Sequence, residues 1–152
     1  MNFDATTICD ASIRTSRFTG EIVAAIGGSV VIEGKSILDI SECLASSRSL
    51  DITQAEYQAL LTGLRVASQL NLRSLRLCGD NEQALELIRK HIDTDNPTIP
   101  KTLRRRLRTL ESLAIVKGSK DEVRRAHDLA NRAAIVRLAE IDKQRSDNRL
   151  LE

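Results

Sequence analysis

The sequence predicts an α/β protein with a five-stranded mixed sheet, three antiparallel strands followed by parallel strands, flanked by helices. Two observations lead to this prediction. Three strand-like segments separated by short linkers occupy residues 6–45, and strand-like and helical segments alternate after residue 50. Strand–helix–strand connections are right-handed, so the fourth strand can return to lie beside the first.

The first three strands are expected to form an antiparallel meander. We place them at residues 6–13, 21–32 and 36–45. The first alternates sides, which puts Asp10 in mid-strand on the same face as Ile8 and Ser12. In the second, Gly27 and Gly28 indicate a bulge or the close approach of another backbone.

After the meander, the apolar pattern changes to helical spacing and back. We expect a helix from residues 51–53 to 70, a strand at 72–78, a helix at 81–91, a helix from 101, a strand at 113–116, and a last helix from 121 to at least 139. Glu56 falls in the first turn of the first helix, and Asp80 follows the fourth strand. The element order is βββαβαα or βββαβααβα.

The helix beginning at Lys101 is amphipathic and basic. Leu103, Leu107 and Leu110 form its apolar stripe. Its basic residues are Lys101, Arg104, Arg105 and Arg108. Such a stripe is usually a solvated helix face, and the alternative is contact with nucleic-acid phosphates.

Length and composition limit the kind of protein. The 152 residues suit one domain, which we place at 1–145, with the polar residues 146–152 as a flexible tail. The net charge of +2 does not by itself indicate a polyanionic partner. Aromatic residues make up only 2% of the chain, so contact with a nucleic acid would involve its backbone instead of stacked bases.

The cysteines and the hydropathy pattern indicate the compartment. Cys9, Cys43 and Cys78 are odd in number, form no CxxC pair and lie in apolar segments. We therefore expect reduced core cysteines instead of disulfides or a zinc site. The chain lacks a signal-like segment and an apolar run of about 18 residues, so we expect a cytoplasmic protein without a membrane partner.

Three acids, Asp10, Glu56 and Asp80, come from distant parts of the chain and converge if the fourth strand lies beside the first. Like charges that close repel one another, and a bound cation relieves the repulsion. Each acid also has an ordinary structural explanation: a solvent-facing strand residue, a first-turn acid and a helix N-cap, respectively.

Four segments resemble the ribonuclease H family, in particular its type 1 and reverse-transcriptase-like branch. CDAS (9–12) is similar to the first-strand motif D-G-[AS], and TQAEYQALLTGLRVA (53–67) to the helix motif N-x-AEY-x-AL-x-x-GL-x-x-A. LCGDNEQALELI (77–88) resembles the segment ending in G-D-S, and RRAHDLANRAA (124–134) the last-helix motif A-D-x-LA-x-x-A. The resemblance spans nearly the whole chain and implies a ribonuclease H-like fold.

The resemblance also implies a site and an activity. Asp10, Glu56 and Asp80 match metal-binding acids, and His127 stands where the family has a fourth acid. The resemblance therefore assigns all four as catalytic residues and metal ligands. The implied activity is two-metal hydrolysis of the RNA strand of RNA/DNA hybrids, with Mg²⁺ or Mn²⁺ and no organic cofactor. The alternative is a catalytically weak module that binds nucleic acid or protein, because His127 lacks the negative charge of an acid.

The register of the last helix leaves two residues for the fourth position. Aligning the alanines and the leucine of the motif selects His127, and Asp128 is the next residue. Successive helical residues point about 100° apart, so only one of them faces the acids, and we favour His127. An imidazole suits Mn²⁺ better than Mg²⁺. Dimerisation is not indicated either way by the sequence.

Overall fold

The protein is described by a computed structural model that covers residues 2–44 and 50–151. The elements are β1 (Ala5–Thr15), β2 (Ile22–Ile32), β3 (Lys35–Cys43), α1 (Ile52–Ala67), β4 (Ser74–Gly79), α2 (Glu82–Asp93), α3 (Lys101–Leu107), β5 (Ser112–Lys117) and α4 (Lys120–Leu150). Their order is βββαβααβα, the second of the two predicted orders. Ala45, the expected last residue of the third strand, lies outside the described residues.

The five strands form one mixed sheet in the order β3-β2-β1-β4-β5. β1 pairs antiparallel with β2, and β2 antiparallel with β3. β4 pairs in parallel with both β1 and β5. The predicted α/β fold is therefore confirmed, including the return of the fourth strand to lie beside the first.

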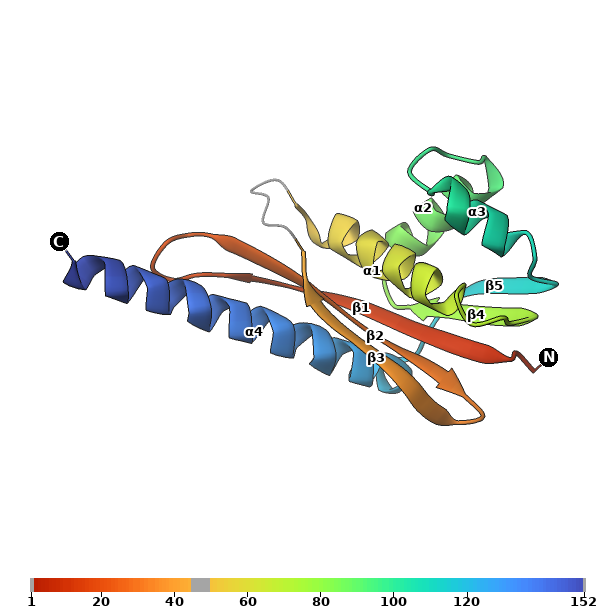
Figure 1. Ribbon diagram of the computed structural model, residues 1–152, viewed down its shortest axis with the longest axis horizontal. Helices are drawn as coiled ribbons and strands as arrows, with labels where there is room; N and C mark the ends of the chain where they lie inside the picture. Colours follow the sequence, from red (N-terminus) through yellow and green to blue (C-terminus); the bar gives the residue numbers. More distant parts are fainter. Residues whose placement is uncertain (1, 45–49, 152) are drawn as a thin grey trace.

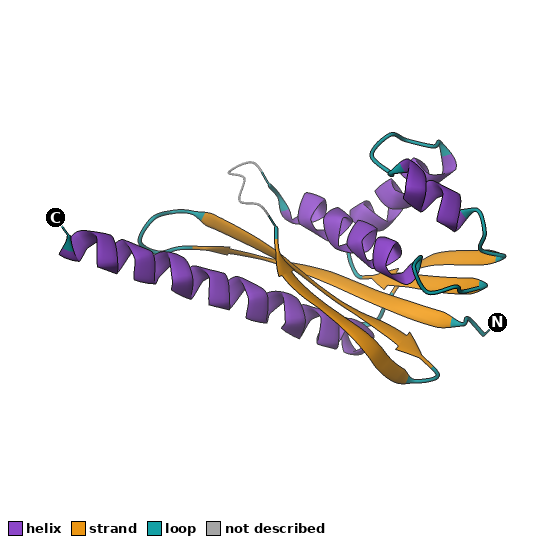
Figure 2. Ribbon diagram, viewed as in Figure 1, coloured by secondary structure: helices purple, strands orange, loops and turns teal. Residues whose placement is uncertain are grey.

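Helices cover both faces of the sheet (Figures 1 and 2). α1, α2 and α3 lie on one face, and α4 runs along the other and continues beside the far ends of β1 and β2. The main core lies between the sheet and the helices α1, α2 and α3. Its fully buried large side chains include Leu60, Leu64, Leu75, Leu77, Leu85 and Ile88.

Alternation along β1 sends its side chains to two different layers. Cys9 and Ala11 belong to the core cluster on the α1 side, whereas Ile8 packs with Val123 and Ala126 of α4. Asp10 and Ser12 follow Ile8 at intervals of two, so they point toward α4. The predicted shared face of these three residues is thus the face that α4 covers.

Gly27 allows α4 to approach the sheet closely. It pairs with Asp10 across the β1–β2 ladder. A Cβ at this position would overlap the carbonyl oxygen of Ala126 and the amide nitrogen of Ala130 in α4. The predicted close approach is confirmed, whereas the irregularity in β2 lies between Val30 and Val31, away from the glycine pair.

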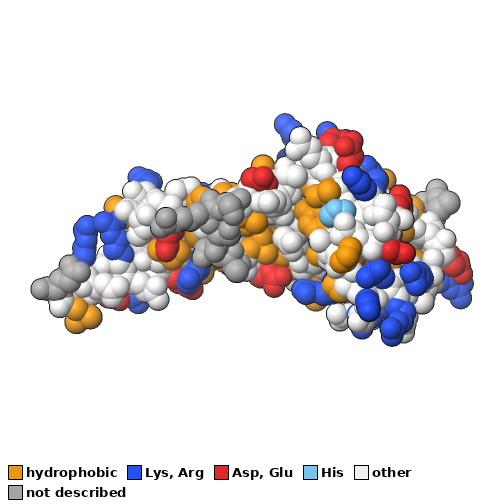
Figure 3. All heavy atoms as spheres, turned by 90° about the horizontal axis from the view of Figure 1, so that it is seen from above, with side chains coloured by type: hydrophobic (Ala, Val, Ile, Leu, Met, Phe, Trp, Pro, Cys, Tyr) orange, Lys and Arg blue, Asp and Glu red, His pale blue; other side chains and the backbone are white. Residues whose placement is uncertain are grey.

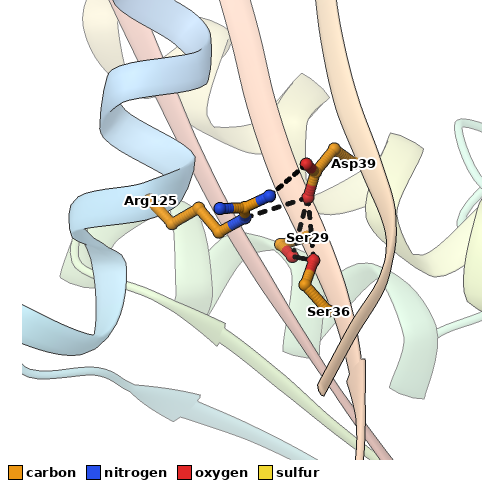
Figure 4. A network of polar contacts seen from close by, with 4 residues as sticks. All are labelled: Ser29, Ser36, Asp39 and Arg125. Atoms are coloured by element: carbon orange, nitrogen blue, oxygen red, sulfur yellow. Dashed lines mark hydrogen bonds and ion pairs between the residues drawn. The ribbon is translucent and has the colours of Figure 1, made fainter. Parts of the chain in front are cut away.

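A polar network ties α4 to the antiparallel part of the sheet (Figure 4). The Arg125 guanidinium donates to both carboxylate oxygens of Asp39, and Ser29 and Ser36 donate to Asp39 Oδ1 at 3.0 and 2.9 Å. These hydrogen bonds, led by that from Arg125, lower the pKa of Asp39 to about 2. The network joins β2, β3 and α4 one turn before the close approach at Gly27.

Two local expectations differ from the structure. The basic helix α3 ends at Leu107 because Arg108 is its C-cap and the chain then turns into β5, so Leu110 is not helical. Cys43 is exposed instead of buried, because β3 is an edge strand with little packed over it. Cys9 and Cys78 are buried as expected.

The last helix extends beyond residue 139, the minimum that the sequence indicates. α4 has 31 residues and continues to Leu150, so residues 146–150 are helical where a tail was expected. These residues carry no glycine or proline that would end a helix. In the described part of the chain, no helix combines the length and apolar character needed to cross a membrane.

Replacing Gly27 with alanine should weaken the docking of α4. Its Cβ would meet backbone atoms, which cannot rotate away, so we expect a loss of about 1–3 kcal/mol in the free energy of unfolding. Gly28→Ala is the matched control, because there the nearest atoms lie at 3.2 and 3.3 Å and one belongs to a side chain. Urea denaturation measures both. Equal losses would contradict the account of α4 docking.

Candidate metal centre

The site forms where β1 extends past the end of β4. The parallel ladder between these strands ends with Ile8 opposite Cys78, and β4 itself ends at Gly79. Asp10 and Asp80 each lie two residues beyond that last pair, so they are level with each other at the open edge of β1. The strand register alone therefore brings these two acids together.

The third acid comes from the first turns of α1. Asp51 caps this helix in a capping box, accepting from the Gln54 amide while the Gln54 side chain accepts from the Asp51 amide. Gly63 lets α1 lie close on β1, since a Cβ there would overlap the Cys9 sulfur. Together these features fix both the start of α1 and its distance from β1, and hence the position of Glu56.

The three carboxylates form a compact group. One oxygen from each of Asp10, Glu56 and Asp80 lies within 4.8 Å of the other two. Asp10 is 3% exposed and Glu56 5%, whereas Asp80 is exposed at the rim. The ordinary explanations therefore fail for all three acids. Asp10 does not face solvent, and Glu56 lies beyond the first turn of α1, which begins at Ile52 and holds no acid in that turn. Asn81, not Asp80, caps α2.

Burial and neighbouring carboxylates disfavour the charged forms of Glu56 and Asp80. Burial, followed by the hydrogen bond and charge of Asp10 and by the charge of Asp80, raises the pKa of Glu56 to about 10. Burial and the charge of Asp10 likewise raise the pKa of Asp80. Clustered carboxylate oxygens are the donors that hard divalent cations prefer, so these residues fit Mg²⁺ or Mn²⁺.

His127 reaches the same group from α4. Its Nδ1 lies 2.7 Å from Oδ2 of Asp10. Asp128, the alternative in the sequence register, is exposed one residue further round the helix. The structure therefore brings together Asp10, Glu56, Asp80 and His127, and it selects His127 over Asp128 as the residue that faces Asp10.

Two further residues contact this group and were missed from the sequence. Asn131 Nδ2 lies 2.9 Å from His127 Nε2, and Ser12 Oγ lies 2.6 Å from Asn131 Oδ1. The available signals were weak: Ser12 shares the face of Asp10 in its strand, and Asn131 lies four residues after His127 in its helix.

A pocket of about 260 Å³ opens over the centre. Its lining consists of Asp10, Asp80, Lys120, Val123, Arg124 and His127. Two cationic residues thus stand beside the acids, on the first turns of α4. Such a mixed lining suits a phosphate group that approaches bound cations.

The basic residues of α3 lie apart from the acids. Lys101, Arg104, Arg105 and Arg108 line a separate shallow pocket. In Figure 3, which views the molecule from the side of α1, α2 and α3, Lys and Arg side chains gather over α3. Arg104 also has a structural task, because its guanidinium donates to the backbone carbonyls of Ile99 and Asp95.

Comparison with known proteins gives a consistent family. The reverse transcriptase-like family profile matches residues 9–133. No curated protein sequence matches the chain.

Several solved structures share the fold. RNase H1 of the archaeon Halobacterium salinarum is 23% identical over 85% of this chain and 96% of its own, with a TM-score of 0.63. The N-terminal RNase H domain of rv2228c from Mycobacterium tuberculosis is 15% identical over 93% and 99%, with a TM-score of 0.68. LC11-RNase H1, solved in complex with an RNA/DNA hybrid, is 18% identical over 88% and 99%, with a TM-score of 0.58.

Neutralising Glu56 should stabilise the metal-depleted protein at neutral and alkaline pH. The folded-state pKa of Glu56, about 10, lies above its ordinary value of 4.5. Between these pH values the folded protein keeps a proton that the unfolded chain has released, so stability falls as pH rises. Glutamine carries no titrating proton, so we expect Glu56→Gln to remove the part of the fall in stability with pH that comes from Glu56. Its Tm at pH 8 should be higher than that of the wild type by about 3 °C or more.

Differential scanning calorimetry with a chelator present measures this effect. Glu42→Gln, at an exposed position of β3, is the matched control and should leave Tm nearly unchanged. Mn²⁺ should raise the Tm of the wild type and should raise that of Glu56→Gln less. A lower Tm for Glu56→Gln at pH 8 would contradict the electrostatic description of the centre.

Proposed function

The chain belongs to the reverse transcriptase-like family, whose fold is that of ribonuclease H, and on this premise we propose that it hydrolyses the RNA strand of RNA/DNA hybrids as a metal-dependent endoribonuclease. The observation that carries the proposal is the group of three acids, Asp10, Glu56 and Asp80, with one oxygen of each within 4.8 Å of the others. They come from β1, from α1 and from the turn that follows β4, and they meet at one open strand edge. A cluster this repulsive is costly unless a cation binds there.

The proposed roles follow from the placement of the side chains. Asp10 contacts His127 and has an oxygen within 4.8 Å of those of the other two acids, so its carboxylate would help to hold Mg²⁺ or Mn²⁺. Glu56 and Asp80 complete the carboxylate shell from either side, and His127 occupies the position of the family's fourth acid. Bound ions of this kind supply Lewis-acid activation of the phosphodiester and of the attacking water.

Cationic side chains outside the acid cluster support a polyanionic substrate. Lys120 and Arg124 line the pocket beside Asp10 and Asp80, where they can attract the phosphate on either side of the cleaved bond. α3 offers a second basic surface further along. LC11-RNase H1, which has the same fold, was solved with an RNA/DNA hybrid. RNA is told from DNA by its 2′-hydroxyl groups, so the cleaved strand is expected to be RNA.

One observation favours the alternative, a catalytically weak module that binds nucleic acid or protein. His127 brings no negative charge, and in the structure its Nδ1 is engaged with Asp10. A centre with three carboxylates instead of four holds divalent cations less strongly. The metal affinity of the purified protein distinguishes the two functions, because a module without catalysis needs no Mn²⁺ at the acids.

Cleavage of a labelled RNA/DNA hybrid, with Mg²⁺ and separately with Mn²⁺, tests the proposed activity. We expect cleavage, and we expect Asp80→Asn to slow it at least about a hundredfold, equivalent to about 2.7 kcal/mol of transition-state stabilisation. Asp128→Asn, an exposed neighbour on α4, should leave the rate unchanged. No cleavage by the wild type with either metal would overturn the enzymatic function.

The basic surface of α3 should contribute to binding without contributing to the chemistry. We expect Lys101→Ala, Arg105→Ala and Arg108→Ala, combined, to weaken hybrid binding and to reduce the slope of log affinity against log salt by about 2 to 3. Arg104 is left in place because of its backbone contacts. Fluorescence anisotropy from about 50 to 200 mM salt measures the slope. An unchanged slope would show that α3 does not touch phosphates.

A further inference from the structure

A row of hydrogen bonds runs from β1 through α4 and back to β1. It joins Ser12 Oγ to Asn131 Oδ1 at 2.6 Å, Asn131 Nδ2 to His127 Nε2 at 2.9 Å, and His127 Nδ1 to Asp10 Oδ2 at 2.7 Å. Ser12 is only 8% exposed and Asp10 only 3%. The row therefore begins and ends on buried β1 side chains that lie two residues apart on one face.

The direction of each hydrogen bond follows from the chemistry of the groups. Because Oδ1 of the Asn131 amide faces Ser12, the Ser12 hydroxyl donates to it, and the amide NH₂ faces His127. An amide NH₂ only donates, so His127 Nε2 must accept and carries no proton. The single ring proton of the neutral imidazole is then on Nδ1, where it is donated to Asp10.

This assignment leaves neither ring nitrogen open to a cation. Nδ1 uses its proton toward Asp10, and the lone pair of Nε2 points to Asn131. One oxygen from each of the three acids lies within 4.8 Å of the others without any atom of His127. A histidine that donates to a carboxylate orients that carboxylate, and the groups behind the histidine fix its tautomer.

We infer that Asn131, held by Ser12, is a positioning residue that fixes His127 as the Nδ1–H tautomer, and that His127 orients the Asp10 carboxylate instead of binding a metal ion. The tautomer stands on the hydrogen-bond geometry alone. The statement about metal rests on the proposed function. Its chemical consequence is a centre that binds divalent ions through three carboxylates, with the fourth family position converted to a hydrogen-bond donor.

The tautomer can be measured in the metal-depleted protein. The chain has only two histidines, His91 and His127, so long-range ¹H–¹⁵N spectra at pH 8 are assigned with a His127→Asn variant. We expect Nδ1 at the chemical shift of a protonated ring nitrogen and Nε2 at that of an unprotonated one. A proton on Nε2, alone or together with Nδ1, would overturn the inference.

Variants of the row test whether Asn131 sets this state. Asn131→Asp keeps the shape but offers only acceptors, so Nε2 should gain a proton. Ser12→Ala removes the group that orients the amide, and its Nε2 signal should shift toward the protonated position. Thermal unfolding confirms that both variants are folded. An unchanged tautomer in Asn131→Asp would show that Asn131 does not control it.

Two substitutions of His127 separate orientation from metal binding. The amide nitrogen of asparagine lies near the position of Nδ1 and can still donate to Asp10, whereas the tip of glutamine reaches the position of Nε2. In Mn²⁺ titration calorimetry we expect His127→Asn to stay within about threefold of the wild type and His127→Gln to bind about tenfold more weakly. The reverse order would mean that His127 is a ligand through Nε2.

Failure of the inference and failure of the proposed function give different results. A wild type that binds no Mn²⁺ and cleaves no hybrid would remove the proposed function, and the spectra of the metal-depleted protein would still decide the tautomer. A protein that binds Mn²⁺ and cleaves hybrids, but carries the proton of His127 on Nε2, would retain the function and overturn the inference.

Discussion

The structure depends on holding three carboxyl groups together at the open edge of β1, where burial and proximity oppose the ionisation of Glu56 and Asp80. Two unit charges 4.8 Å apart, the upper limit of separation in this group, would repel by about 3 kcal/mol at an effective dielectric constant of about 20. The protein keeps these acids together by strand register, by the capped start of α1 and by the close contact at Gly63. A cation that binds there would relieve the repulsion between carboxylates that the fold has already brought together.

The second constraint is the docking of α4. Gly27, opposite Asp10, lets this helix lie against the sheet, and the Arg125–Asp39 network fixes it to β2 and β3. His127 and Asn131 follow on the same helix, so their contacts with Asp10 and Ser12 depend on this docking. The fourth position is therefore defined by packing as much as by residue type.

The elements and three acids could be predicted because each depends on a short stretch of sequence. Asp10 lies in an alternating strand, Glu56 in a recognisable helix motif, and Asp80 directly after a strand. The partners of His127 could not be predicted in this way. The Ser12–Asn131 hydrogen bond joins residues 119 positions apart, and its formation depends on the distance between α4 and β1. The end of α3 was also missed, and the end of α4 was given only as a minimum, because helical periodicity marks helix faces better than helix ends.

In the proposed function the acids would bind the metal ions and the cations beside them would attract phosphates. His127 stands where the family has a fourth acid. The most direct test of this account is a crystal structure of the protein grown with Mn²⁺, examined by anomalous scattering. We predict manganese peaks within bonding distance of the carboxylates of Asp10, Glu56 and Asp80. The absence of a manganese peak at these three residues, in crystals grown at a saturating Mn²⁺ concentration, would contradict the assignment of the cluster as a metal centre.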